Sequence, residues 1–350
     1  MRYIYDLMDF AELTAYARER VNDNRGRSLL AQFLPDEYRA SIEYRTIQAR
    51  RANRAASIRA FDTPAQIGRR GTLKDVRGKL PPISQILPLS ESEQITLRQI
   101  YGGPNADVAE VLEDAVFNDV DNVVTSVYNR IELLRGEVLS TGTILIPELQ
   151  QEVDYGVDPL NIVAAATPWT DTTPDIYGFL MTLQDRFVVS SDGEEAGIML
   201  ASRKAIQHML RDPQIRGLAG SSPNSPAVTP DQLNAALTIN GLPRVVRYDR
   251  RVQDANGVSQ RVIPENTIVF LPAGGGEDGQ AGSPIGETQH GLTAEAARFV
   301  RDGVLDADQA AGMVVGLLEE DNPPTDSTLG TTVALPVLSR PEALVAATVF

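Results

Sequence analysis

Apolar residues recur at steps of three and four between residues 105 and 135, and this run is the clearest pattern in the chain. Its members are Val108, Val111, Leu112, Ala115, Val116, Val120, Val123, Val124, Val127, Ile131 and Leu134. Such spacing places side chains on one face of an α-helix. No glycine or proline interrupts the run; Asn105 suits its N-cap, and Gly136 suits a left-handed end. We predict one continuous helix over 105–135, with its valine face packed on a sheet.

Shorter patterns on both sides of this run predict a mixed chain of helices and strands. An apolar anchor is expected at 28–35, stopped by Pro35. Three- and four-residue spacing predicts helices at 9–20, 176–187, 201–210, 229–237 and 293–300. Two-residue alternation and short apolar runs predict strands at 144–146, 153–157, 197–200, 244–249, 258–263, 267–271, 312–318, 331–338 and 343–349. Asn256-Gly257 is expected to turn the chain between the strands 244–249 and 258–263.

Residues 45–80 lack a helical or strand period that would form a core. Arginines and small residues alternate there, with Thr63-Pro64 and Arg70-Gly71 as breakers. Pro81-Pro82 and Pro88 then favour extended chain. We predict a long extended hairpin or arm with little core of its own.

The charge is divided unevenly along the chain, although the whole sequence is acidic with a formal charge of -15. Residues 1–80 hold 16 of the 32 basic residues and 10 of the 47 acids, so they carry 16 - 10 = +6. Within them, 45–79 has ten basic residues against Asp62 and Asp75. Such a segment can bind nucleic acid, can lie on the acidic body of another copy, or can be a solvated face.

The composition excludes several classes of site. The absence of cysteine excludes disulfides, thiolate metal sites and cysteine nucleophiles, and two histidines make a multi-histidine metal site unexpected. No apolar run approaches the roughly 18 residues of a membrane span. Acidic residues interrupt the N-terminal stretch where a signal peptide would be apolar, so we expect a soluble protein made in the cytoplasm.

No catalytic or cofactor site emerges from the remaining candidates. Gly274-Gly275-Gly276 lacks the Gly-Lys-Ser/Thr ending of a phosphate loop. The acidic pairs Asp119/Asp121 and Asp306/Asp308, and the run Glu319-Glu320-Asp321, are interpreted as solvated acids rather than cation ligands. His208, in a helix, and His290, in a loop, have no motif partner for nucleophilic catalysis.

Residues 242–272 (LPRVVRYDRRVQDANGVSQRVIPENTIVFLP) resemble the major capsid protein family of lambda-like tailed bacteriophages, the phage capsid protein E family. The likeness lies in the Asn-Gly turn, the Ile263-Pro264-Glu265-Asn266-Thr267 step and the apolar strand that follows. SLLAQFLPDEYRA, PPISQILPLSESEQ and the ending LPVLSRPEALVAATVF are similar to further parts of that family. The order of parts covers essentially the whole chain, whereas the glycine-rich loop 273–288 departs from the pattern.

The resemblance implies an α+β Hong Kong 97-like capsid fold and a structural role without enzymatic activity. Residues 1–44 would be the N-terminal arm and 45–80 the extended loop. Residues 81–171 with 329–350 would form the peripheral domain, and 172–328 the axial domain. The protein would assemble in the host bacterial cytoplasm into the icosahedral virion capsid that encloses double-stranded DNA.

The resemblance also implies the partners. They are other copies in hexamers and pentamers, the portal, scaffolding and decoration proteins, and packaged DNA held without sequence-specific contacts. No cofactor and no membrane are expected. The extended loop would contact neighbouring subunits through Arg50, Arg51, Arg54, Arg59, Arg69, Arg70 and Lys74. Lys74 and Lys79 lie on its returning limb rather than at its tip, so we expect no covalent lysine–asparagine cross-link.

Two other functions stay open on sequence alone. An encapsulin-like compartment would use the same fold to enclose enzymes. A cytoplasmic enzyme or nucleic-acid-binding protein would use the basic segment 45–79. Single-strand binders place aromatic residues among their basic residues, and Phe61 is the only aromatic residue between 45 and 80. This composition counts against the nucleic-acid-binding alternative.

Overall fold

The structure is a computed structural model of the 350-residue chain. It describes residues 10–26, 28–49, 58, 61, 73–93, 95–96, 108–220, 228–254, 257–273, 283–301, 311–321 and 324–350. The chain divides into two compact units, each assembled from separate stretches of sequence. Unit 1 comprises Met1–Tyr44, Gly78–Arg135 and Thr288–Pro336, and unit 2 comprises Arg45–Arg77, Gly136–Glu287 and Val337–Phe350. No helix among the described residues is long and apolar enough to cross a membrane.

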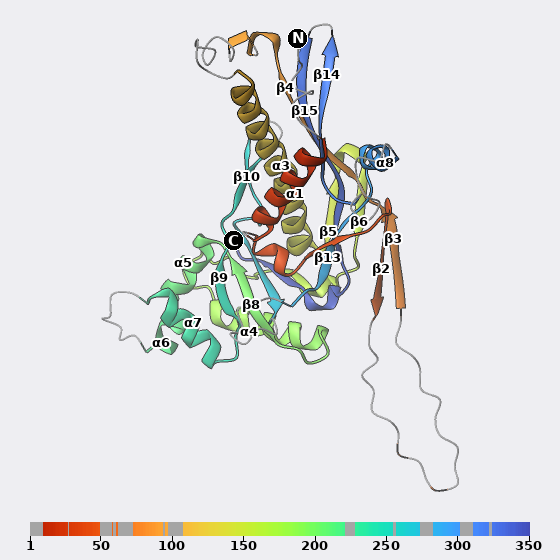
Figure 1. Ribbon diagram of the computed structural model, residues 1–350. Coiled ribbons are helices and arrows are strands. Elements are labelled where there is room, and N and C mark those ends of the chain that lie inside the picture. The colour runs from red at the N-terminus through yellow and green to blue at the C-terminus, as the bar shows by residue number, and fades with distance from the viewer. Residues whose placement is uncertain are drawn as a thin grey trace. The chain divides into compact units, whose positions relative to one another are not determined.

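The long helix predicted from the valine pattern is present as α3, Val108–Thr141 (Figure 1). Asn105, its expected N-cap, lies outside the described residues. The buried side chains are Val120, Val123, Val124, Val127, Ile131 and Leu134, each at most 3% exposed. Exposed residues alternate with this face between 118 and 126, which confirms the one-sided packing there, whereas no residue from 131 to 140 is exposed and the helix is enclosed on all sides. A Cβ placed on Gly330 would lie 2.1 Å from Val123 Cγ1, so the helix rests directly on the strand that carries Gly330.

Gly136 does not end the helix, and this corrects the sequence prediction. The helix continues to Thr141. A Cβ at Gly136 would lie 2.0 Å from the carbonyl oxygen of Val262, so glycine is needed there to let another stretch of backbone approach the helix. Gly142, with φ of +72°, takes the left-handed conformation directly after Thr141.

The N-terminal helix α1, Phe10–Gly26, packs on α3 and on strand β14 (Figure 1). It is longer than the predicted 9–20. Leu13 and Ala17, two members of the predicted apolar stripe, are 1% and 0% exposed. After α1 the 3-10 turn η2, Leu30–Gln32, lies in the anchor predicted at 28–35, and Phe33 and Leu34 are fully buried. The predicted apolar anchor is confirmed.

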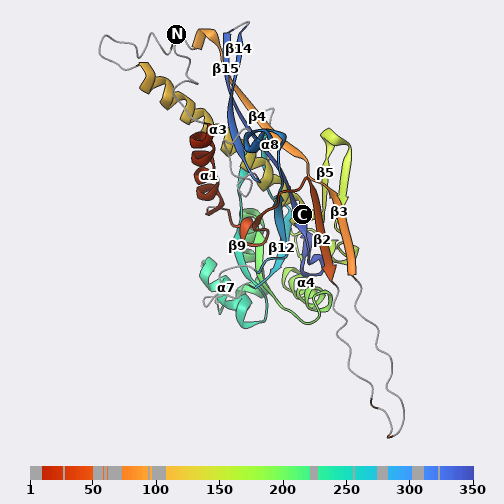
Figure 2. The same cartoon turned by 45° about the vertical axis from the view of Figure 1, so that its right-hand side comes forward.

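The sheet of unit 1 is built around one long strand, β15. Its strands are β1 (Asp36–Tyr38), β4 (Pro82–Leu89), β13 (Gly286–His290), β14 (Val314–Asp321) and β15 (Pro324–Leu338). The order is β1-β13-β15-β14, and β4 also pairs with β15. Strands β14 and β4 both run antiparallel to the same part of β15, so they occupy its two opposite edges (Figure 2). Helix α8, Ala294–Arg301, contributes Ala296 to a small apolar cluster with Val314.

Unit 2 has a mixed five-stranded sheet of order β7-β16-β12-β8-β9. Its strands are β7 (Ile162–Ala164), β8 (Ala196–Ala201), β9 (Arg244–Arg247), β12 (Thr267–Pro272) and β16 (Val345–Thr348). The helices of the unit are α4 (Ile176–Ser190), α5 (Arg203–Arg211), α6 (Pro213–Leu218) and α7 (Pro230–Ile239). The predicted capping box opens α7, because Thr229 and Gln232 exchange side-chain and backbone hydrogen bonds. Asp175 caps α4 from outside its first turn.

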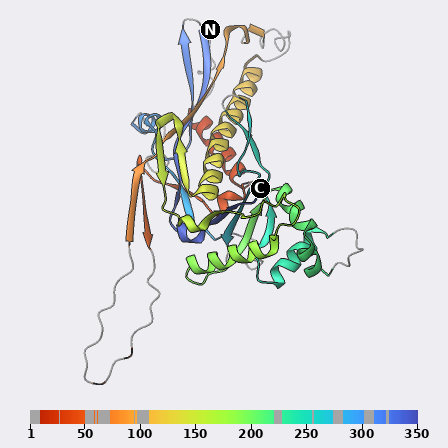
Figure 3. The same cartoon turned by 180° about the vertical axis from the view of Figure 1, so that it is seen from behind.

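Three two-stranded hairpins complete the described chain. They pair β2 (Glu43–Ala49) with β3 (Leu73–Lys79), β5 (Thr143–Ile146) with β6 (Gln151–Asp154), and β10 (Arg251–Gln253) with β11 (Ser259–Arg261). The pair β5–β6 follows α3 in yellow-green (Figure 3) and matches the predicted alternation. Strands form within both predicted ranges, 244–249 and 258–263, but the turn that contains Gly257 connects β11 to the short strand β10 and not to the strand within 244–249. Strand β9 joins β8 with its buried Val245, and the short strand β10 pairs with β11 instead.

Candidate assembly interface

The basic segment predicted to contact other subunits starts and ends in a two-stranded stem. Strand β2 leads out and β3 leads back, as expected for an extended hairpin. Six of the predicted contact residues lie outside the described residues: Arg50, Arg51, Arg54, Arg59, Arg69 and Arg70. Lys74 is the one predicted contact residue that the structure describes, and it is exposed on β3. The stem, β2 with β3, is therefore the part of this interface that the structure describes.

The two faces of β2 differ. Tyr44, Thr46 and Gln48 are at most 8% exposed, whereas Ile47 is 54% exposed. Gln48 Nε2 donates hydrogen bonds to the carbonyl oxygens of Tyr155, at 2.9 Å, and Leu338, at 3.2 Å. Since a buried amide that bonds two backbone carbonyls has a fixed direction, Gln48 holds this end of the stem in place. The other face of β2 stays open to solvent.

An ion group occupies the exposed face of the stem. Arg45 donates to both carboxylate oxygens of Asp75, through Nε at 3.2 Å and Nη2 at 3.1 Å. Arg77, two residues further along β3, donates to Asp75 through Nε at 2.9 Å and also through Nη2. The hydrogen bonds from Arg77 and Arg45 lower the pKa of the Asp75 carboxyl to about 2. One carboxylate thus joins two arginines, and the group keeps a net positive charge for an acidic partner.

Lys74 lies beside the backbone of Gly156. A Cβ placed on Gly156 would be 2.8 Å from Lys74 Nζ, and Gly156 itself has φ of +71°. The positive φ favours glycine at this position, whereas the flexible lysine side chain could move away from a Cβ. The sequence offered no signal for this contact, because 82 residues separate the two positions (156 - 74 = 82).

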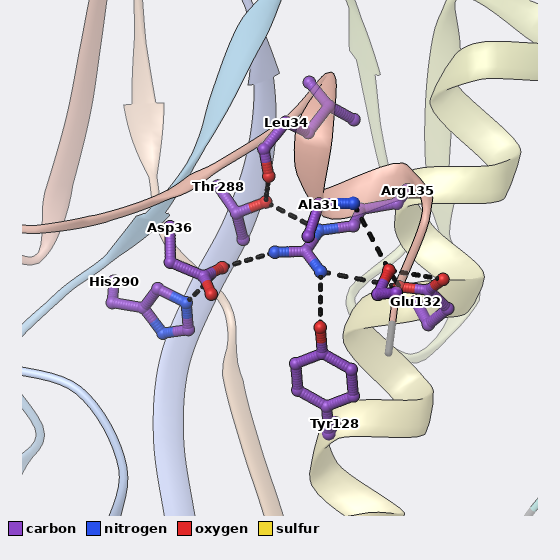
Figure 4. Close-up of polar contacts among 9 residues, drawn as sticks. Ala31, Leu34, Asp36, Tyr128, Glu132, Arg135, Thr288 and His290 are labelled. Carbon is purple, nitrogen blue, oxygen red and sulfur yellow. Dashed lines mark hydrogen bonds and ion pairs between the residues drawn. The ribbon is translucent and has the colours of Figure 1, made fainter. Parts of the chain in front are cut away.

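A buried charge cluster in unit 1 joins the N-terminal segment, α3 and β13 (Figure 4). At its centre, Arg135 pairs with Asp36 and lies 3.4 Å from Glu132, and all three side chains are at most 1% exposed. Arg135 Nε donates to Thr288 Oγ1 at 2.9 Å, and Nη1 donates to the Tyr128 hydroxyl at 3.1 Å. Burial alone lowers the pKa of the guanidinium, but Asp36, Tyr128 and Glu132 together raise it above its ordinary value.

The same cluster fixes the segment that leads to the stem. Ser28 Oγ contacts both oxygens of Glu132 at 2.8 Å. Thr288 Oγ1 donates to the Leu34 carbonyl at 3.0 Å, and the Thr288 N–H donates to the Pro35 carbonyl at 2.7 Å. Residues 28–36 are therefore held by hydrogen bonds at both ends.

His290 has a partner that sequence reasoning missed. It ends strand β13 rather than lying in a loop, and its Nε2 is 3.1 Å from Asp36 Oδ1 (Figure 4). Its ring stacks on Tyr38 with centroids 4.9 Å apart. The parallel pairing of β1 with β13 sets this contact, and the residues are 254 positions apart in the sequence. No local motif could have shown it.

The acidic and histidine candidates take different positions. Asp121 pairs with Arg20 at 2.9 Å, and burial raises the pKa of Asp119. His208 lies on α5 with its ring 5.8 Å from that of Phe350. Gly274-Gly275-Gly276 and Asp306/Asp308 fall outside the described residues. Within the described part of the chain, no three histidine or acidic side chains gather as a metal site would require.

A family of known proteins matches almost the whole chain. The model of the family described as phage major capsid protein E matches residues 9–349. The putative capsid protein of an Escherichia coli CFT073 prophage is 12% identical, with a TM-score of 0.62 over 98% of this chain and 99% of that one. A phage-related protein from Bordetella bronchiseptica RB50 is 13% identical, with a TM-score of 0.53 over 96% and 95% of the two chains. A search of curated protein sequences found no match.

Proposed function

Because the chain belongs to the phage major capsid protein E family and has the Hong Kong 97-like fold, we propose that it builds the icosahedral head of a tailed phage, which encloses double-stranded DNA. The observation that carries this proposal is the family match over residues 9–349. The role is structural, and no enzymatic activity is assigned. The encapsulin-like alternative is weaker, because the matching family is one of phage capsid proteins.

The proposal also assigns each segment of the chain to a part of the capsid subunit. Residues 1–44 act as the N-terminal arm, 45–80 as the extended loop, 81–171 with 329–350 as the peripheral domain, and 172–328 as the axial domain. Copies associate as hexamers and pentamers, and the portal, scaffolding and decoration proteins are the further partners. The buried cluster around Arg135 supports this assignment, because it ties residues 28–36 to α3 within one chain. A fixed departure point is what a segment reaching another subunit requires.

Electrostatics supports the same function. Residues 81–350 carry 16 basic and 37 acidic residues, a net charge of 16 - 37 = -21. An acidic body repels DNA phosphates, so the genome can enter without adhering to the wall. The basic hairpin, with its exposed Arg45–Asp75–Arg77 group, is attracted to the acidic bodies of adjacent copies. Arginine suits such contacts because its planar guanidinium binds carboxylates through two hydrogen bonds.

Negative-stain microscopy of the purified protein tests the function directly. We expect closed shells, or capsomers that close after scaffolding protein is added. Small monodisperse particles under all assembly conditions would overturn the proposal. Shells that contain enzymes and exclude DNA when purified from infected cells would favour the compartment alternative.

A second experiment tests the role of the hairpin. Replacing residues 50–72 by a short Asn-Gly link keeps the stem strands and the Arg45–Asp75–Arg77 group. We expect a folded subunit with the circular dichroism spectrum of the parent that no longer forms shells. A matched variant keeps the loop length and changes its six arginines to glutamine, which separates the charge from the reach of the loop. Normal shell yield from the shortened protein would contradict an intersubunit role for the hairpin.

A further inference from the structure

Strand β14 has an edge that no other strand covers among the described residues. It stands last in the order β1-β13-β15-β14 and pairs only with β15 there. In an antiparallel pair, alternate residues direct their N–H and C=O groups away from the partner strand. Thr14 on α1 donates to the Val315 carbonyl at 3.2 Å, and Arg18 donates to the Met313 carbonyl at 3.4 Å. The backbone N–H and C=O groups of residues 313 and 315 therefore point away from β15. By the same alternation, so do those of residues 317, 319 and 321.

Helix α1 bonds the first half of this edge through Thr14 and Arg18. Among the described residues, no strand pairs with the edge from Leu317 to Asp321. The opposite edge of this part of the sheet is β4, where Pro82 and Pro88 stand at both ends of the strand. Proline on an edge strand prevents another strand from pairing, and this protects the edge. Within the described part of the chain, the sheet thus blocks one edge and leaves part of the other unpaired.

The open edge is acidic, whereas the stem of the hairpin offers a basic edge. The sequence at the end of β14 is Glu319-Glu320-Asp321, and Glu320 is exposed. Strand β3 pairs only with β2 among the described residues. Its basic residues Lys74, Arg77 and Lys79 are exposed, and its one acid, Asp75, is already paired with arginine. The two edges have opposite charge and comparable length.

We propose that β3 of one copy adds as a strand to the edge 317–321 of β14 in the next copy. Backbone hydrogen bonds give the contact its affinity, and the basic and acidic side chains select this pairing over pairing between two like edges. The two edges that pair are different parts of the chain. Each copy can therefore bind one neighbour through its β14 edge and another neighbour through its β3 edge. A heterologous contact of this kind generates a ring when the rotation between copies closes. The inference rests on the proposed capsid function and identifies the surface that receives the stem.

Proline substitution at an outward position tests the edge itself. Glu319→Pro removes an N–H that faces away from β15, so the sheet within the chain keeps its hydrogen bonds. We expect the thermal unfolding of the isolated subunit to stay near that of the parent, while the yield of assembled particles falls more than about tenfold, a change equivalent to losing one or two backbone hydrogen bonds. Glu319→Ala is the matched control; it keeps the N–H and should still assemble. Parent-level assembly of Glu319→Pro would overturn the proposal.

Engineered cysteines test which copies touch, and the absence of native cysteine makes this measurement clean. One preparation carries Glu320→Cys. The others carry Lys74→Cys or Lys79→Cys, which lie on opposite faces of β3 because five positions separate them (79 - 74 = 5). After co-assembly and oxidation, we expect a dimer of twice 38.0 kDa only in mixtures of Glu320→Cys with one lysine variant. Shells without that dimer would overturn the edge pairing and leave the capsid function intact, whereas failure of the parent to form any particle would count against the function.

Discussion

Replacing Arg135 by methionine is the sharpest test of how the N-terminal segment is held. Methionine keeps the apolar stem of the side chain and removes the guanidinium. The change leaves the carboxylates of Asp36 and Glu132 buried without their shared cation, and it removes the hydrogen bonds to Thr288 and Tyr128. Breaking a buried pair by removing one partner costs about 3–5 kcal/mol, because the remaining charge stays out of water. That is a large part of the roughly 5–15 kcal/mol that stabilises a typical domain.

We expect the loss of unfolding free energy in Arg135→Met to come from the unpaired charges rather than from lost packing. A triple variant separates these two causes. Arg135→Met combined with Asp36→Asn and Glu132→Gln removes all three charges and keeps similar volumes. Replacing a whole buried ionic group is often nearly neutral, so the triple variant should recover most of the lost stability. The three residues form one network, so we expect the separate effects to be strongly non-additive.

Urea unfolding of the unassembled subunit measures these effects. Far-UV circular dichroism follows both units, whereas the fluorescence of Trp169, the only tryptophan, follows unit 2. Arg135→Met should lower the unfolding midpoint seen by circular dichroism without changing its slope. A loss below about 1 kcal/mol, the range of a surface pair, would refute the reasoning. So would a triple variant as unstable as the single one.

Three further predictions concern single features of the chain. Gly136→Ala should destabilise the subunit by about 1–3 kcal/mol in a thermal melt, because its Cβ would meet a carbonyl oxygen at 2.0 Å; Gly217→Ala, in a helix with open space, should be neutral or stabilising. The pKa of Asp75 is about 2, below its unfolded value of 3.8, so its contribution is present above 3.8 and lost as the pH falls through about 2. Light scattering should therefore show intact shells at pH 5, because Asp75 is still ionised and its ion pairs with Arg45 and Arg77 persist. Shells that lose the stem contact at pH 5 would contradict the role of Asp75. High salt should weaken the stem contact. Mature particles boiled in SDS should run as one band near 38.0 kDa, whereas a surviving ladder would show that Lys74 or Lys79 is reactive.

The elements that sequence reasoning found are those whose side chains repeat with one period over many residues. Helix α3 buries a valine every three or four positions, and that spacing by itself predicts the buried face of its described part. The capping box of α7 was equally local, because Thr229 and Gln232 are three residues apart. Local sequence determines such features, since the partners of each residue lie within one turn.

The ends of elements were less predictable, because distant residues decide them. Gly136 and Gly142 both follow the valine pattern, and either could have ended α3 on local grounds. The backbone at Val262, 126 residues away (262 - 136 = 126), occupies the space that Gly136 leaves within the helix, whereas Gly142 takes the left-handed conformation after its end. In the same way, β9 pairs with the distant strand β8 in the central sheet, and β10 forms the hairpin with β11.

The buried cluster shows why charge counts could not locate the most constrained residues. Asp36, Arg135 and His290 each look like ordinary surface residues in the sequence. The parallel pairing of β1 with β13 brings Asp36 beside His290, and α3 supplies Arg135. The basic excess of 45–79 was visible at once, but it left nucleic acid, the acidic body of another copy and a solvated face as alternatives. The structure adds backbone geometry to that charge: as far as the chain is described, no strand covers the acidic end of β14, in a sheet whose other edge carries proline. A charge pattern alone selects the sign of a partner, whereas an unpaired edge also requires the partner to be an extended strand. Assembly of a closed shell from identical chains needs both.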